Sequence, residues 1–266
     1  MSWVITGASK PPLLLDTYSG AAAAYSLRNL SLAYGGSVVR VRRSSDNTES
    51  DFTATQVSDG TLAAWVGAGN NGFVRTWYDQ SGSGRNATQA TVSLQPQIVT
   101  NGAVLNNNGK PTIDFIGDYL QTLSFGSIIA QPSTVSIVFN HASGNATYVF
   151  YDGIDVNNRQ FLSTGGFQYT TSAALPLRNT PMSTGTKLIT SVYNGASSGQ
   201  FINGVNTING DAGANSLGGL TIGSTYNGTA NPPSTLYIQE LICYPTNQTT
   251  NRAAIESNIN AHYVIY

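Results

Sequence analysis

The sequence predicts an all-β protein, an antiparallel two-sheet sandwich with a few peripheral helices, and two observations support this class. Residues that favour strands, such as Thr, Val, Ile and Tyr, are plentiful, whereas only 9% of the chain is charged, so Lys and Glu for exposed helix faces are scarce. Short strand-like runs also recur between turn-rich stretches, which is typical of a sandwich. A chain of 266 residues can form one domain around a single large core.

The first 15 residues are apolar and are interrupted by Pro11 and Pro12. They predict an extended arm, residues 1–15, that leads into one domain over residues 16–266. Burial against another chain would remove the large side chains of the arm from water, so we expect a homo-oligomer, for example a trimer, or a stable complex. The alternative is that the arm adds an edge strand to its own sandwich. The side chains expected in the contact are Trp3, Val4, Ile5, Leu13, Leu14 and Leu15.

Three helices are expected. The first follows the arm, because the run Ala21–Ala24 has a high helix propensity and Gly35-Gly36 can end the helix. The second is a short helix over Thr61–Val66, and the third is a closing helix within Thr246–Tyr263, where apolar residues recur along one face. All three would pack their apolar faces on the core.

The strands are predicted from apolar and β-branched runs that lie between turn residues. The Asn203-Gly204 pair stands between apolar flanks and predicts a tight hairpin turn. In chain order the expected strands cover residues 37–43, 73–78, 111–115, 133–140, 147–151, 187–193, 200–202 and 235–244.

Charge and cysteine content limit the classes of function. A formal net charge of -1 produces no long-range field that would attract nucleic acid or anionic lipid, and no apolar run is long enough to span a bilayer. We therefore expect no nucleic-acid partner, no membrane span and no cofactor. The single cysteine, Cys243, cannot form a disulfide within the chain. The N-terminus lacks the basic start and long apolar core of a signal peptide, so export by such a signal is not expected.

Two short motifs resemble functional sites, but a structural interpretation is favoured for each. Gly195–Gly199 matches the pattern G-x-S-x-G, yet strands are predicted on both sides, whereas a nucleophile elbow needs a helix after the serine. The run Asp152–Asn158 offers oxygen ligands for Ca²⁺ but lacks the glycine and closing glutamate of an EF-hand, so an Asx-rich turn is favoured. No metal site is predicted, and the weak candidates for one are Asp152, Asp155 and Asn157.

Two longer blocks carry a family resemblance. Arg40–Thr48 (RVRRSSDNT) and Thr76–Gln89 (TWYDQSGSGRNATQ) resemble the catalytic β-sandwich domain of type B α-L-arabinofuranosidases. The resemblance covers most of residues 16–263 and implies a concanavalin-like jelly roll. Asp79 and Asn86 remain within the second block, but its turn-forming composition favours an architectural role for both side chains.

The same resemblance implies that the active site of the family is absent here. Its nucleophile is a glutamate in the middle of the domain, and this chain has no Glu between Asp51 and Gln239. The acid of the family follows a Gly-rich strand, where this chain has Ser224 or Thr225. Hydroxyl groups cannot replace the two carboxyl groups of a retaining glycosidase, so no enzymatic activity is expected. The adjacent cysteine pair of the family corresponds to Tyr148-Val149.

The blocks and the charge-poor composition also resemble proteins of tailed bacteriophages. This resemblance implies a non-catalytic structural or adhesion protein on the virion surface, such as a head fibre, a capsid decoration protein or a tail-tip component, with other virion proteins as partners; otherwise an extracellular location is expected. The alternatives are a secreted carbohydrate-binding module and a glycoside hydrolase with its carboxylates moved to Asp114, Asp118, Asp152 or Asp155. Where a glycan binds, the contacts are expected at Tyr151, Asp152, Tyr169 and Tyr226.

Overall fold

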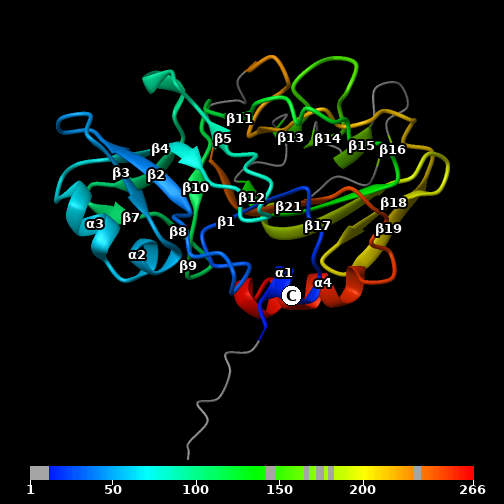
Figure 1. The fold of residues 1–266 in the computed structure, drawn as a ribbon, viewed down its shortest axis with the longest axis horizontal. Coiled ribbons are helices and arrows are strands. Elements are labelled where there is room, and N and C mark those ends of the chain that lie inside the picture. Colours follow the sequence, from blue (N-terminus) through cyan, green and yellow to red (C-terminus); the bar gives the residue numbers. More distant parts are fainter. Residues whose placement is uncertain (1–11, 142–147, 165–167, 172–176, 179–182, 230–234) are drawn as a thin grey trace, which may run out of the picture.

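The strands form two antiparallel sheets that pack face to face, as predicted (Figure 1). The computed structural model describes residues 12–141, 148–164, 168–171, 177–178, 183–229 and 235–266, without the side chains of residues 164–182. The inner faces of both sheets contribute to one large apolar core, in which Trp77, Phe139 and Tyr148 are fully buried. The architecture is therefore a β-sandwich.

The first sheet contains the short strands at the rim of the sandwich. Neighbouring strands follow one another in space in the order β3 (Glu49–Phe52), β2 (Val39–Arg43), β4 (Gly72–Trp77), β5 (Ala87–Thr88), β11 (Leu120–Thr122), β20 (Thr221–Ile222), β13 (Val149–Asp152), β14 (Phe161–Thr164), β15 (Gln168–Thr171) and β16 (Leu177–Arg178).

The second sheet contains the long strands. Its order is β21 (Leu236–Tyr244), β12 (Ser133–His141), β17 (Gly185–Tyr193), β18 (Ser198–Ile202) and β19 (Val205–Gly210), with β1 (Ala23–Ser26) and β10 (Ile113–Asp114) both paired to the free edge of β21. The remaining strands are β6 (Gln97–Thr100), which pairs with both β4 and β10 and so links the sheets, β7 (Ala103–Val104), and the hairpin β8 (Asn106–Asn107) with β9 (Lys110–Pro111).

Two helices cover the outer face of the second sheet. Helices α1 (Leu14–Thr17) and α4 (Arg252–Tyr263) lie below the long strands in Figure 1 and bury a second apolar cluster with Val138, Leu188 and Ile242. Strands β12, β17 and β21 are consequently buried on both faces along much of their length. Helices α2 (Ala54–Ser58) and α3 (Thr61–Val66) pack at the end of the sandwich near β7, and a short 3₁₀ turn covers Val92–Leu94. Among the described residues no helix is long and apolar enough to cross a membrane.

The helix predicted at Ala21–Ala24 is wrong, because this segment leads into strand β1. Ala23 and Ala24 pair with Cys243 and Ile242 of β21. Ala23 contributes to the large core and Ala24 to the cluster under the helices, so the strand is buried on both faces. Small side chains fit this double burial, and pairing along a central strand outweighs the local helix propensity of alanine.

The arm is also shorter than predicted. Leu14 and Leu15 form helix α1 and are buried in the cluster under α4 of their own domain, so the prediction that they contact another chain is wrong. Leu13 is half-buried at the start of α1. Trp3, Val4 and Ile5 lie outside the described residues. The domain therefore includes at least two residues that the sequence assigned to the arm.

Two local predictions are confirmed. The turn between β18 and β19 places Asn203 and Gly204 at φ angles of 49° and 82°, the left-handed conformation that an Asn-Gly hairpin turn requires. Asp79 has an architectural role: its Oδ1 accepts the N–H of Ala24 at 2.9 Å and its Oδ2 accepts the N–H of Arg85 at 3.0 Å. Asn86 in turn accepts the N–H of Asp79 at 3.0 Å.

Candidate functional site

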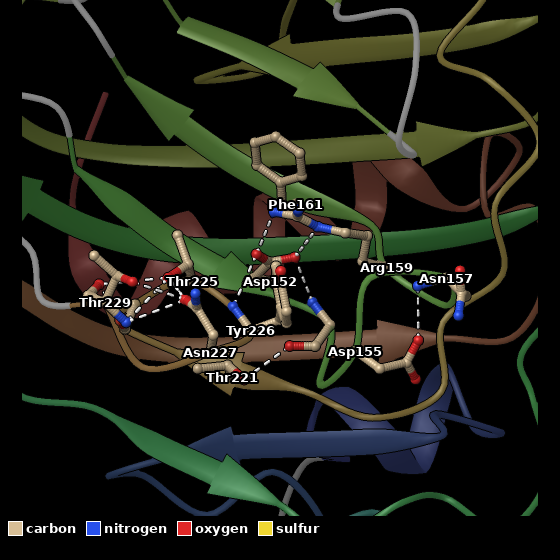
Figure 2. A network of polar contacts seen from close by, with 12 residues as sticks. Asp152, Asp155, Asn157, Arg159, Phe161, Thr221, Thr225, Tyr226, Asn227 and Thr229 are labelled. Atoms are coloured by element: carbon tan, nitrogen blue, oxygen red, sulfur yellow. Dashed lines mark hydrogen bonds and ion pairs between the residues drawn. The ribbon is translucent and has the colours of Figure 1, made fainter.

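Asp152 is the centre of a polar network at the rim of the sandwich (Figure 2). It ends β13, opposite Thr221 of β20, and its side chain is fully buried. Its Oδ1 accepts the N–H of Gly153 at 2.7 Å and Nε of Arg159 at 2.9 Å, and its Oδ2 accepts Nη2 of Arg159 at 2.5 Å and the N–H of Tyr226 at 3.0 Å. Each carboxylate oxygen therefore receives two hydrogen bonds.

A tight turn brings Arg159 back to Asp152. Gly153 is required here, because a Cβ at this position would lie 2.6 Å from the carbonyl oxygen of Asn158. Oδ1 of Asp155 accepts the N–H groups of Asn157 and Asn158, both at 2.8 Å. This is the Asx-rich turn that the sequence predicted. The turn thus uses Asp155 and Asn157 for local structure.

The guanidinium of Arg159 lies between two aromatic rings. Its Cζ is 4.5 Å from the ring centroid of Phe161 and 4.8 Å from that of Tyr226. Figure 2 shows the three residues at the site. Stacking of this kind combines with the bidentate ion pair to hold the cation in one orientation. Only 17% of the Arg159 side chain is exposed, and Tyr226 is half-buried.

The loop after β20 completes the site. Gly223 has a φ of +85°, and a Cβ there would lie 2.3 Å from the ring of Phe115, so only glycine fits. The Ser224 hydroxyl donates to the carbonyl of Thr229 at 2.5 Å, and the Thr225 hydroxyl donates to Oδ1 of Asn227 at 2.6 Å. Asn227 and Thr229 are exposed. Both hydroxyls therefore stabilise the loop.

The chemistry open to Asp152 is limited by these contacts. Burial raises the pKa of its carboxyl, and the charge of Arg159 with the two backbone N–H groups opposes this effect. A nucleophile or a general acid needs an oxygen that can reach a ligand, whereas both oxygens of Asp152 already accept two donors. The network can orient loops and aromatic rings, but it does not present a free carboxylate.

A second pair of carboxyls lies near β10. Burial raises the pKa of Asp114 to about 6. Burial and the charge of Asp114 raise the pKa of Asp118 to about 7. Oδ1 of Asp114 accepts the N–H of Leu236 at 3.2 Å, and no ion pair to either carboxyl exists among the described residues. Of the four aspartates predicted for a rearranged hydrolase site, the structure thus brings Asp114 and Asp118 close enough to influence each other.

The predicted glycan contacts have different environments in the structure. Tyr151 is fully buried and its hydroxyl lies 2.9 Å from that of Tyr193, so its ring cannot contact a glycan at the surface and this part of the prediction is wrong. Each carboxylate oxygen of Asp152 already accepts two hydrogen bonds. The Tyr169 side chain lies outside the described part of the chain. Tyr226 alone of the four is both described and partly accessible.

Sequence reasoning missed Arg159 and Phe161. A usable signal was present, because an aspartate in an apolar strand such as β13 needs a cationic partner, and Arg159 is the first arginine after it. Nothing in the spacing indicated that the guanidinium would stack between Phe161 and Tyr226. For metal ions, the described residues contain no cluster of three or more His, Cys, Asp or Glu side chains.

Comparisons with known proteins agree on the fold. No family model and no curated protein sequence matches the chain. Among solved structures, a GH54 α-L-arabinofuranosidase soaked with a cyclic sulfate inhibitor matches 91% of this chain with a TM-score of 0.66 at 15% identity. An arabinofuranosidase complexed with arabinofuranosyl-α-1,2-xylobiose matches the same share with a TM-score of 0.63 at 15% identity. The chain spans 62% of the length of each of these proteins. The protein therefore has a β-sandwich fold of the kind found in these glycoside hydrolases.

Proposed function

We propose that this protein is a non-catalytic carbohydrate-binding domain whose ligand contacts Tyr226 and the polar loop around it. One observation carries the proposal. The carboxylate of Asp152 is paired with Arg159, and the guanidinium of Arg159 contacts the ring of Tyr226. The shared fold with arabinofuranosidases supports a sugar as the ligand class. A partly accessible ring with exposed amide and hydroxyl groups beside it, here Asn227 and Thr229, suits the apolar face and hydroxyls of a sugar.

A binding experiment tests this function. A glycan array should identify a ligand, with arabinofuranosyl oligosaccharides as the first set, and calorimetry should then measure its affinity. Tyr226→Ala should weaken binding by about fivefold to tenfold, the value of one aromatic contact. The matched control is Tyr266→Ala, which removes a tyrosine that is 53% exposed at the other end of the domain. No array hits, or equal affinities for the two variants, would contradict the proposal.

A second candidate function is glycoside hydrolysis through Asp114 and Asp118. The observation that favours it is the pair of raised pKa values, because a glycosidase needs one carboxyl that stays protonated near neutral pH. Assay against aryl arabinofuranosides distinguishes the two functions. A binding domain gives only background turnover, whereas turnover that Asp118→Asn abolishes and Asp155→Asn retains would establish the hydrolase.

The setting that we propose for this domain is the surface of a virion, as part of a homo-oligomer or bound to other virion proteins. The resemblance of the two sequence blocks to phage proteins and the charge-poor composition support it. With Leu14 and Leu15 buried within the domain, the remaining residues that we propose for such a contact are Trp3, Val4, Ile5 and the half-buried Leu13. Light scattering of the full chain and of a chain that begins at Pro12, together with a test of binding to virions, tests the assembly: monomers in both cases and no binding to virions would contradict it.

A further inference from the structure

A cavity of about 640 Å³ lies far from the Asp152 network. It is open to solvent on one side and is lined by α2, the start of α3, β7, the β8–β9 hairpin, the segment after β1 and the end of α4. In Figure 1, α2 and β9 lie at the lower left, whereas β13 and β14 lie in the upper part of the molecule. Its volume is in the range of pockets that hold small organic molecules, about 300–1,000 Å³.

The lining of this cavity combines aliphatic and polar residues in similar proportion. Leu27 and Val57 are core residues that reach its lining, and Val104 is packed against the same core. The aromatic ring of Tyr263 lines it too, but that residue is only 1% exposed. The aliphatic part of the lining suits the hydrocarbon body of a ligand. The aliphatic part of the lining consists of Leu27, Ala54, Val57, Ala63, Ala103, Val104 and Pro111.

The charged groups of the lining are all basic. Arg28 is fixed by Glu240, which accepts its Nε at 2.8 Å and its Nη2 at 3.0 Å. Lys110 has no ion pair or side-chain hydrogen bond among the described residues, and no Asp or Glu belongs to the lining. Burial lowers the pKa of His262 to about 4, and the charge of Arg28 adds to this effect. At neutral pH the imidazole is therefore neutral and offers one donor and one acceptor.

The cavity thus has an aliphatic wall and, at one side, the ammonium group of Lys110, which no acidic side chain of the lining neutralises. Glu240 balances the charge of Arg28, which leaves the charge of Lys110 for a ligand. We propose that this cavity binds a small organic carboxylate with an aliphatic or aryl body, whose carboxylate pairs with Lys110 and whose body packs on the aliphatic wall. This site is separate from the proposed glycan site, and neither depends on the other.

The proposal is tested with two acids and their neutral amides. Hexanoate and benzoate are titrated into the ¹⁵N-labelled full chain, with hexanamide and benzamide as uncharged isosteres. The acids should bind with dissociation constants on the order of 1 mM, the affinity expected of ligands of this size, and should shift the amide signals of Leu27, Val57 and His262. The amides should bind at least about fivefold more weakly, because they lack the charge that pairs with Lys110.

Two variants and one control locate the site. Lys110→Gln should weaken binding of the acids by about tenfold, since one charge-assisted hydrogen bond is lost. Ala63→Phe should abolish binding, because Ala63 is half-buried in the lining and a phenyl ring can fill the cavity without entering the core. Lys187→Gln makes the same charge change on β17, outside the lining, and should bind like the parent. Equal affinity for acids and amides, no saturable binding of either acid, or full affinity of the Lys110 variant would overturn the proposal.

Discussion

Glu240 and Asp152 are buried carboxylates that each bind an arginine, but the two networks connect different parts of the structure. Glu240 lies in the middle of β21 and is 1% exposed, and it binds Arg28, the Ser26 hydroxyl and the Tyr263 hydroxyl. Asp152 lies at the end of β13, between β20 and β14, and binds Arg159 and two backbone N–H groups. The Glu240 network connects β1 and α4 to the second sheet. The Asp152 network connects the turn from Gly153 to Arg159 with the loop after β20.

This difference has an energetic consequence. Removal of one partner from a buried ion pair leaves an uncompensated charge, and its cost depends on whether that charge can reach water. Arg28 and Arg159 are similarly covered, with 15% and 17% of their side chains exposed. Arg159 lies in the loop between β13 and β14, whereas Arg28 also binds Asn258 of the helix α4 at 3.1 Å. We therefore expect the network around Glu240 to be the more important for global stability.

The largest effect is expected for Glu240→Ala. Loss of this carboxylate should lower the free energy of unfolding by about 3–5 kcal/mol, because Arg28 and the hydroxyls of Ser26 and Tyr263 lose their acceptor. Urea denaturation followed by tryptophan fluorescence measures the change. The double variant Arg28→Met with Glu240→Leu should recover part of it, since no buried charge remains. A loss below about 1 kcal/mol for Glu240→Ala would remove the distinction between the networks.

Asp152→Ala should have a smaller and more local effect. We expect a loss of about 2–3 kcal/mol, because Arg159 can turn toward solvent when its partner is removed. Hydrogen exchange should accelerate at the N–H groups of Gly153 and Tyr226, which donate to Asp152, and remain slow in β12. Equal acceleration in β12 would mean that the rim network stabilises the whole sandwich, contrary to the comparison.

Asp114, which is buried, and Asp118, which is half-buried, extend the comparison to carboxyls without an ion-pair partner among the described residues. Their pKa values are raised to about 6 and about 7, so the folded protein retains these protons at pH values where the unfolded chain has lost them. The free energy of unfolding should therefore fall as the pH rises from about 4.5 to 8. Asp118→Asn should reduce this fall, whereas the exposed control Asp211→Asn should follow the parent. The measurement is urea denaturation across this pH range, and parallel curves for parent and Asp118→Asn would contradict the prediction.

The smallest effect is expected at the surface. Arg40 and Asp51 form a bidentate ion pair with distances of 2.9 and 2.8 Å, but their side chains are 42% and 37% exposed. Asp51→Ala should lower the free energy of unfolding by less than about 1 kcal/mol, and the loss should shrink further in high salt. A loss comparable to that of Glu240→Ala would show that geometry, and not burial, determines the contribution of these ion pairs.

The sequence determined the features that rest on local chemistry. Alternating and β-branched runs predicted the long strands, and Asn203-Gly204 predicted the hairpin turn, because each pattern depends on neighbours a few residues apart. Asp155 in its Asx turn is the same kind of feature. The architectural role of Asp79 could also be inferred, since its turn-rich block favours backbone contacts over ligand contacts.

The tertiary structure decided whatever depends on partners distant in the chain. Ala21–Ala24 leads into a strand because β21, more than 200 residues away, offers a pairing edge with both faces buried. Tyr151 is a core residue and Tyr226 a surface one, although both were equally plausible glycan contacts in the sequence. Asp152 is an ion-pair partner because a turn returns Arg159 to it. Burial and long-range pairing set these outcomes, and neither is encoded in local periodicity.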